Sequence, residues 1–194
     1  MRFLFAALLM GCLGTAQPLF AQGYANEWSV RYSLQRAHAS SSNDVFTMQG
    51  SGMDFAQSIA RLHPHLRLAL VLDASGETAS EIRNAGFGLS TFSLSAGPRI
   101  SYRPGSSTLF VQGLVGWAHG FNSRFPLANN QMESSADSLQ AVAGGGLEFP
   151  LHGRLLLRLP QIEYLYTGLP NNASNRQNSL RVSAGLAIRF HPRH

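Results

Sequence analysis

The chain has 194 residues, only 13% of which are charged, and all 15 of its basic residues are arginines. A soluble domain typically carries about 25% charged residues, so the composition argues against an ordinary soluble protein. The net charge is +5, but the arginines are spread along the chain rather than gathered in one run, which argues against a nucleic-acid-binding protein.

The N-terminal segment has the pattern of an export signal. Arg2 supplies a positive start, and residues 3–14 form an apolar run as long as a signal-peptide core. The run is shorter than the ~20 residues that a membrane-spanning helix needs, which argues against an uncleaved anchor. We predict a signal peptide over residues 1–21, cleaved after Ala21, and one mature domain over residues 22–194.

Cys12 offers an alternative processing site. It ends the sequence Leu9-Met10-Gly11-Cys12, which looks like a lipoprotein box, although the apolar core before it would be very short. Cys12 is also the only cysteine of the chain. Because it lies within the leader, we expect the mature chain to contain no disulfide and no cysteine metal site.

After the leader, apolar and polar residues alternate with a period of two, the pattern of β-strands. In the last such segment, one face carries Leu180, Val182, Ala184, Leu186, Ile188 and Phe190. The pattern recurs about every 20 residues along the chain. It predicts eight strands, over residues 26–36, 47–60, 65–75, 87–102, 108–119, 137–149, 154–167 and 178–190.

The lengths of the strands and connections favour a membrane barrel. Several segments are longer than the 5–6 residues usual in soluble sheets and reach the ~9–11 residues that cross a bilayer. Short connections at 61–64, 103–107 and 150–153 alternate with longer ones at 37–46, 76–86, 120–136 and 168–177. Short turns on one side and long loops on the other are typical of outer-membrane barrels. We therefore predict an all-β fold, an eight-stranded antiparallel up-and-down transmembrane β-barrel.

The aromatic residues support the same topology. It places Trp28, Tyr102, Phe149 and Phe190 at the ends beside the short turns, and Phe87, Trp117, Tyr164 and Tyr166 toward the long loops. Two such girdles are expected where aromatic rings lie at the membrane interfaces.

Eight strands enclose a lumen that side chains can fill. We assign ten charged residues to the inward face and expect them to form an ion-pair network that plugs the barrel. Six arginines against four acids leave an excess of positive charge for water, backbone or a bound anion. The ten are Arg31, Asp54, Arg67, Asp73, Arg99, Glu148, Arg158, Glu163, Arg181 and Arg189.

Strand 154–167 changes its alternation at Pro160. Before this residue, Leu155, Leu157 and Leu159 share a face; after it, the apolar residues Ile162, Tyr164 and Tyr166 have the opposite parity. Proline is tolerated at β-bulges. One extra residue at Pro160 would place both apolar sets on the lipid side.

Four segments resemble the outer-membrane β-barrel family that includes the OmpA/OmpX-type barrels: 95–102, 144–148, 161–167 and 177–190. The resemblance covers most of the mature chain and implies a fold and an outer-membrane location. Members of this family commonly end on an aromatic residue that the barrel-assembly machinery reads. Phe190 matches this feature, with His191–His194 extending beyond it.

Candidate catalytic, metal and phosphate sites are weak in this sequence, and we predict no enzyme, no cofactor and no catalytic or metal-binding residue. His38-Ala39-Ser40 resembles the His-x-Ser pair of lipid A deacylases but opens a loop. His63 and His65 have no evident third metal ligand. His119 lies near Ser123 only in sequence, and Gly144–Gly146 lacks the spacing of a phosphate loop. The region 128–142 could form a short loop helix.

The predicted function is a passive one. We expect a monomer surrounded by outer-membrane lipids and lipopolysaccharide, with a structural role or a ligand bound by its outer loops. The alternatives are a narrow channel, then a lipid-modifying enzyme, then a soluble ligand-binding barrel.

Overall fold

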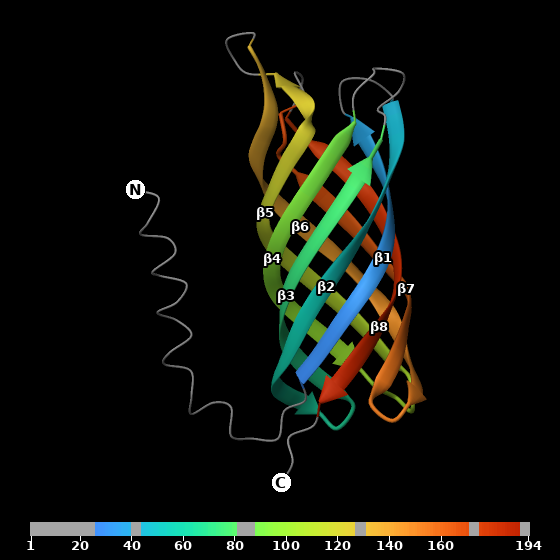
Figure 1. Cartoon of the computed structure of the whole chain (residues 1–194). Coiled ribbons are helices and arrows are strands. Elements are labelled where there is room, and N and C mark those ends of the chain that lie inside the picture. The colour runs from blue at the N-terminus through green and yellow to red at the C-terminus, as the bar shows by residue number, and fades with distance from the viewer. Residues whose placement is uncertain (1–25, 40–43, 81–87, 127–130, 171–174, 191–194) are drawn as a thin grey trace.

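The computed structural model describes residues 26–39, 44–80, 88–126, 131–170 and 175–190. Each strand pairs antiparallel with the next, and the first pairs with the last, so that the sheet closes into a barrel (Figure 1). This confirms the predicted eight-stranded up-and-down barrel. The strands are β1 (Asn26–Ala39), β2 (Asp44–His63), β3 (Leu66–Ala79), β4 (Leu89–Tyr102), β5 (Thr108–Pro126), β6 (Met132–His152), β7 (Leu155–Thr167) and β8 (Gln177–Phe190).

The two ends of the barrel differ. The connections after β2, β4 and β6 are short and lie at the same end as Asn26 and Phe190, which we call the short-turn end (Figure 1). The C-terminal ends of β1, β3, β5 and β7 lie at the opposite end, which we call the loop end. No helix among the described residues is long and apolar enough to cross a membrane.

Strands β5 and β6 are longer than the sequence pattern predicts. The expected connection over 120–136 is wrong, because β5 continues to Pro126 and β6 begins at Met132. The loop helix considered for 128–142 is also wrong for its described part, which is strand. A register shift between Phe121 and Phe125 interrupts the alternation there, which explains why the pattern ended the strand early.

Some expectations lie outside the described residues. These are the signal peptide over 1–21, the lipoprotein box at Cys12, and Phe87 of the predicted aromatic girdle. Ser40 also lies outside them, whereas the backbone of His38 belongs to β1 instead of opening the loop.

The predicted bulge at Pro160 is present. The pairing of β7 with β8 runs from Arg158↔Gly185 to Gln161↔Ser183, so β7 has one residue more than its partner across this step. As a result Leu159 and Ile162 both lie exposed on the outer face, while Arg158 and Gln161 are both buried. The bulge thus keeps apolar Leu159 and Ile162 outside and polar Arg158 and Gln161 inside on the two sides of Pro160.

The outer surface of the barrel is apolar. Large hydrophobic side chains from all eight strands are exposed on it, with Leu139 at 68% and Val115 at 65% of their full accessible area. Trp28, Tyr102, Phe149 and Phe190 are exposed near the short-turn end, and Trp117 and Tyr164 are exposed nearer the loop end. Tyr166 is only half-buried. The exterior therefore has the predicted aromatic residues on either side of an aliphatic band.

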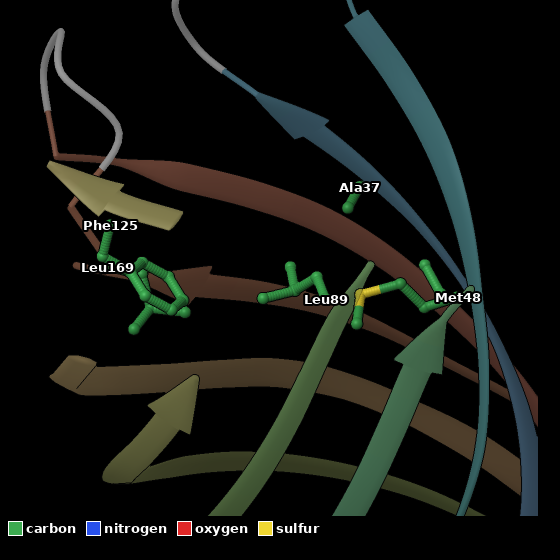
Figure 2. Packing of buried hydrophobic residues seen from close by; sticks show 6 residues of the cluster. Ala37, Met48, Leu89, Phe125 and Leu169 are labelled. Atoms are coloured by element: carbon green, nitrogen blue, oxygen red, sulfur yellow. The ribbon is translucent and has the colours of Figure 1, made fainter. Parts of the chain in front are cut away.

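Buried apolar side chains fill the barrel toward the loop end. Ala37, Met48, Ala79, Leu89, Phe125 and Leu169 form one cluster (Figure 2). Deeper in the lumen a second cluster contains Ala56, Val71, Leu114, Val142 and Leu165. The interior also contains buried charged side chains, among them Arg158, Arg181 and Glu163.

Candidate functional site: the charged lumen and its mouth

The lumen holds most of the charged residues that alternation assigns to the inward face. Eight of the ten predicted residues are buried. Arg189 keeps 11% of its side-chain accessible area, and Arg67 is half-buried at the short-turn end. The predicted ion-pair network is present, and its members come from strands that are far apart in the sequence.

Arg158 of β7 lies at the centre of the network. Its Nη1 donates to Asp54 Oδ2 at 2.6 Å, and its Nη2 donates to Glu27 Oε1 and Glu148 Oε1, both at 2.7 Å. The side chain is 1% exposed. A guanidinium presents five N–H donors in a fixed plane, which lets this one residue join three carboxylates from β1, β2 and β6.

Arg99 and Arg189 complete the cluster around the same carboxylates. Arg99 Nη2 donates to Asp54 Oδ1 at 3.1 Å, and Arg189 Nη2 donates to Glu27 Oε2 and Glu148 Oε2, both at 2.8 Å. The ring of Phe110 also contacts two guanidinium groups, with Arg99 Cζ at 4.6 Å and Arg158 Cζ at 4.9 Å from its centroid. These distances are suitable for cation–π attraction.

Arg181 of β8 organises a second cluster closer to the loop end. Its Nη1 donates to Glu77 Oε1 at 2.8 Å, and its Nε donates to Glu163 Oε2 at 2.9 Å. Arg31 joins the two clusters, because its Nη1 lies 2.6 Å from Asp73 Oδ2 and 3.5 Å from Asp54 Oδ2. The charged lumen is therefore one continuous network.

Two glycines allow Arg31 to lie flat against the barrel wall. Gly52 and Gly185 are its direct neighbours on β2 and β8. A Cβ atom at Gly52 would lie 2.9 Å from Arg31 Cζ, and one at Gly185 would lie 2.2 Å from the carbonyl oxygen of Val30. The contact at Gly185 is with backbone and excludes a side chain there, whereas a side chain at Gly52 would displace the Arg31 guanidinium.

Two lumen carboxylates are absent from the ten predicted residues: Glu27 and Glu77, which are 7% and 4% exposed. Glu27 shares the inward parity of Ser29 and Arg31, so alternation could have found it. Glu77 lies beyond the predicted strand, which ends at residue 75, whereas β3 continues to Ala79.

With these two residues included, the ion pairs of the described residues join six carboxylates to five arginines, and Arg67, the sixth arginine predicted for the network, is not among them. Six carboxylates now stand against the six arginines that were predicted to face inward. The carboxylates are those of Glu27, Asp54, Asp73, Glu77, Glu148 and Glu163.

The network closes the barrel between two cavities. A cavity of about 190 Å³ opens at the short-turn end and is lined by residues such as Arg67, Ser101 and Arg103. A second, of about 20 Å³, lies toward the loop end beside Met48 and Leu169. The two share no lining residue. This arrangement is that of a plugged barrel with a basic mouth.

The structure places several of the histidine and glycine candidates in the described part of the chain. His119 Nδ1 lies 2.7 Å from Asp137 Oδ1 on the outer surface, where Trp117 also donates to this carboxylate; its partner is thus Asp137 and not Ser123. His63 and His65 have ring centroids 6.0 Å apart. The described residues contain no group of three or more possible metal ligands. Gly144–Gly146 lies within β6. A Cβ atom at any of these glycines would lie less than 3 Å from a backbone carbonyl oxygen of β5 or β7.

Comparisons with known proteins reveal similar structures only. No protein-family model and no curated protein sequence matches the chain. The crystal structure of Neisserial surface protein A (NspA) is 14% identical with a TM-score of 0.62, and the match covers 86% of this chain and 99% of that chain. The outer membrane enzyme PagL is 14% identical with a TM-score of 0.58, over 82% and 98% of the two chains.

A third similar structure is that of Ail, the attachment invasion locus protein of Yersinia pestis. It is 18% identical with a TM-score of 0.55, and the match covers 87% of this chain and 99% of that chain. At such identities the likeness establishes the fold. The chain has the fold of the small outer-membrane β-barrels.

Proposed function

We propose that this protein is a resident of the bacterial outer membrane with a passive role, either as a structural barrel or as a support for loops that bind a partner at the cell surface. The observation that carries the proposal is the inversion of the molecule: its outside is apolar and its inside is charged. Soluble monomers rarely expose contiguous apolar patches of more than a few hundred Å², whereas here the exposed hydrophobic residues come from every strand.

The surroundings of such a barrel would be lipid. Membrane lipids would cover the aliphatic band, and lipopolysaccharide would surround the loop end, where Arg36, His119 and Asp137 replace hydrophobic residues on the outer surface. The similar structures include a surface protein, an attachment invasion protein and an enzyme, so the fold is compatible with several roles.

The filled lumen favours the passive role over a channel. Arg158, Arg181 and Glu163 are at most 1% exposed and block the interior between the two cavities. A conducting pore would need a continuous path of water past these side chains, and opening one would break several buried ion pairs, each costly to separate.

The proposal is tested on the full chain expressed in a Gram-negative host. We expect the protein in the outer-membrane fraction, with a different mobility on a denaturing gel before and after boiling, because a closed barrel resists detergent until it is heated. In planar bilayers the same preparation should show no steady conductance. Recovery in the periplasmic fraction without a mobility shift would refute the membrane assignment, and stable unitary currents would establish a channel instead.

A further inference from the structure

The mouth of the barrel at the short-turn end is strongly basic and leaves some of its charge uncompensated. Arg67 and Arg103 line the cavity there and are half-buried, while Arg61 and Arg154 are exposed nearby on the rim. Arg61 is the direct neighbour of Arg67 across β2 and β3, and Arg103 and Arg189 line the same cavity as Arg67. Like charges gathered in this way repel one another unless an anion lies between them.

The carboxylates of the chain do not supply that anion. Glu27 borders the cavity, but both of its oxygens are occupied by Arg99, Arg158 and Arg189. The ion pairs among the described residues do not include Arg67 or Arg103. Outside the lumen network, the described acidic residues are Asp44, Glu133 and Asp137, which belong to the loop-end parts of β2 and β6.

The wall of the cavity is held in place by contacts between two turns. The backbone N–H of Arg103 donates to the carbonyl oxygen of His65 at 2.8 Å, and His65 Nδ1 donates to the carbonyl oxygen of Arg103 at 3.0 Å. Arg103 Nε also donates to the carbonyl oxygen of Gly105 at 3.3 Å. These bonds tie the β2–β3 turn to the β4–β5 connection, so the site needs little reorganisation to receive a ligand.

The rest of the lining suits a small oxyanion. Ser58, Ser101 and Thr108 add hydroxyl groups to the arginines. Arginine binds phosphate and carboxylate groups bidentately, and it remains charged at all physiological pH values. The volume of about 190 Å³ provides space for a compact head group.

We propose that this mouth is a binding site for a phosphate-bearing anion, with Arg67 and Arg103 as its principal ligands. Two sources share this chemistry: the head group of an acidic phospholipid in the adjacent leaflet, and a soluble phosphate ester on the same side. The first source rests on the proposed membrane location, and the second does not. The site lies at the opposite end from the loops and is independent of any partner that they bind.

The experiment uses the folded full chain in a zwitterionic detergent, with tryptophan fluorescence and calorimetry as readouts. One arm titrates glycerol 1-phosphate, and the other titrates phosphatidylglycerol in mixed micelles, with zwitterionic phosphatidylcholine as the reference lipid without net charge. We expect saturable binding in at least one arm, weakened by salt because the interaction is between exposed charges. If only the lipid saturates the site, the ligand is the phospholipid head group. If both compounds saturate it, the site recognises the phosphate group itself.

Arg67→Gln is the test variant, and Arg36→Gln is its matched control. Arg67 takes part in no ion pair of the lumen network, so its replacement should leave the barrel intact, which the gel mobility shift verifies. Arg36 is exposed on the outer surface at the loop end.

We expect a loss of affinity of about tenfold or more for Arg67→Gln, a similar loss for Arg103→Gln, and none for Arg36→Gln. Absence of binding in both arms, or equal losses in all three variants, would overturn the proposal while leaving the proposed function in place.

Discussion

At the scale of single residues, the lumen depends on a few arginines that each serve several carboxylates. Arg158 is the clearest case, since Glu27, Asp54 and Glu148 all lie within 2.7 Å of its terminal nitrogens. Removing one partner of a buried ion pair lowers stability by more free energy than the intact pair contributes, because the remaining charge stays buried without compensation.

Arg158→Met should therefore lower the free energy of unfolding by about 3–5 kcal/mol. Methionine retains much of the length of the side chain, so the loss would arise from the charge and not from a cavity. The measurement is a urea titration of the protein refolded in lipid or detergent. Arg36→Met, on the exposed outer surface, is the control and should change stability by less than about 0.5 kcal/mol. Similar values for both variants would contradict a structural role of the network.

Most lumen residues could be predicted because side chains alternate strictly along a strand. Parity alone places Arg31, Asp54 and Arg181 inside, and the structure confirms it. Parity cannot find residues beyond a misjudged strand end, as for Glu77, nor can it show which carboxylate an arginine contacts. Those contacts depend on the stagger of the strands around the barrel, which sets which side chains from opposite walls meet.

At the scale of the elements, β7 depends on its one-residue bulge. On either side of Pro160 the strand presents apolar residues outward and Arg158 or Glu163 inward. A shift of one residue moves every side chain of a strand to the other face. The bulge was visible in the sequence, because a run of alternating leucines changes parity at a proline.

Deletion of Pro160 should prevent the barrel from forming. Without the extra residue, either Leu155, Leu157 and Leu159 or Ile162, Tyr164 and Tyr166 must turn into the lumen, and Arg158 or Glu163 must face lipid. The loss of the gel mobility shift would report this failure. Pro160→Ala keeps the length of β7 and serves as the control that should still shift. A deletion variant that retains the shift would show that the register tolerates the change.

The loop-end part of β5 shows where the sequence pattern fails. Between Phe121 and Phe125 the strand has more residues than β6 opposite it, and Phe125 joins the buried apolar cluster (Figure 2). Alternation is lost across such an irregularity, so the segment resembles a loop in sequence. Bulges without a proline to mark them leave no comparable signal.

At the scale of the whole molecule, the apolar exterior distinguishes a membrane barrel from a soluble one. Val115 and Leu139, on β5 and β6, are the two most exposed large hydrophobic residues of the outer surface, and Val115 lies on β5 between Leu109 and Trp117. Within a bilayer, the cost of a charged side chain on the lipid face depends on depth and is greatest near the midplane.

Val115→Arg should reduce the stability of the barrel in lipid vesicles by about 2–4 kcal/mol, and Leu151→Arg, close to the short-turn end, by about 0–1 kcal/mol. Both native residues are exposed. A difference between the two variants therefore reports the depth of the substituted residue in the bilayer and not a loss of packing inside the barrel. Reversible denaturant titrations in vesicles give the two values. Equal effects of the two substitutions would indicate that lipid does not surround this surface.

The seam between β1 and β8 has a consequence for how the protein is made. Asn26 pairs with Phe190, and Ala39 pairs with Gln177, so the first strand has one of its two neighbours at the far end of the chain. Glu27 likewise depends on Arg158 and Arg189, 131 and 162 residues away. Contacts this distant in sequence form late and slowly. Until the last strand arrives, the edge of β1 is open and Glu27 lacks its contact with Arg189, so closure of the ring also completes the ion pairs of this carboxylate.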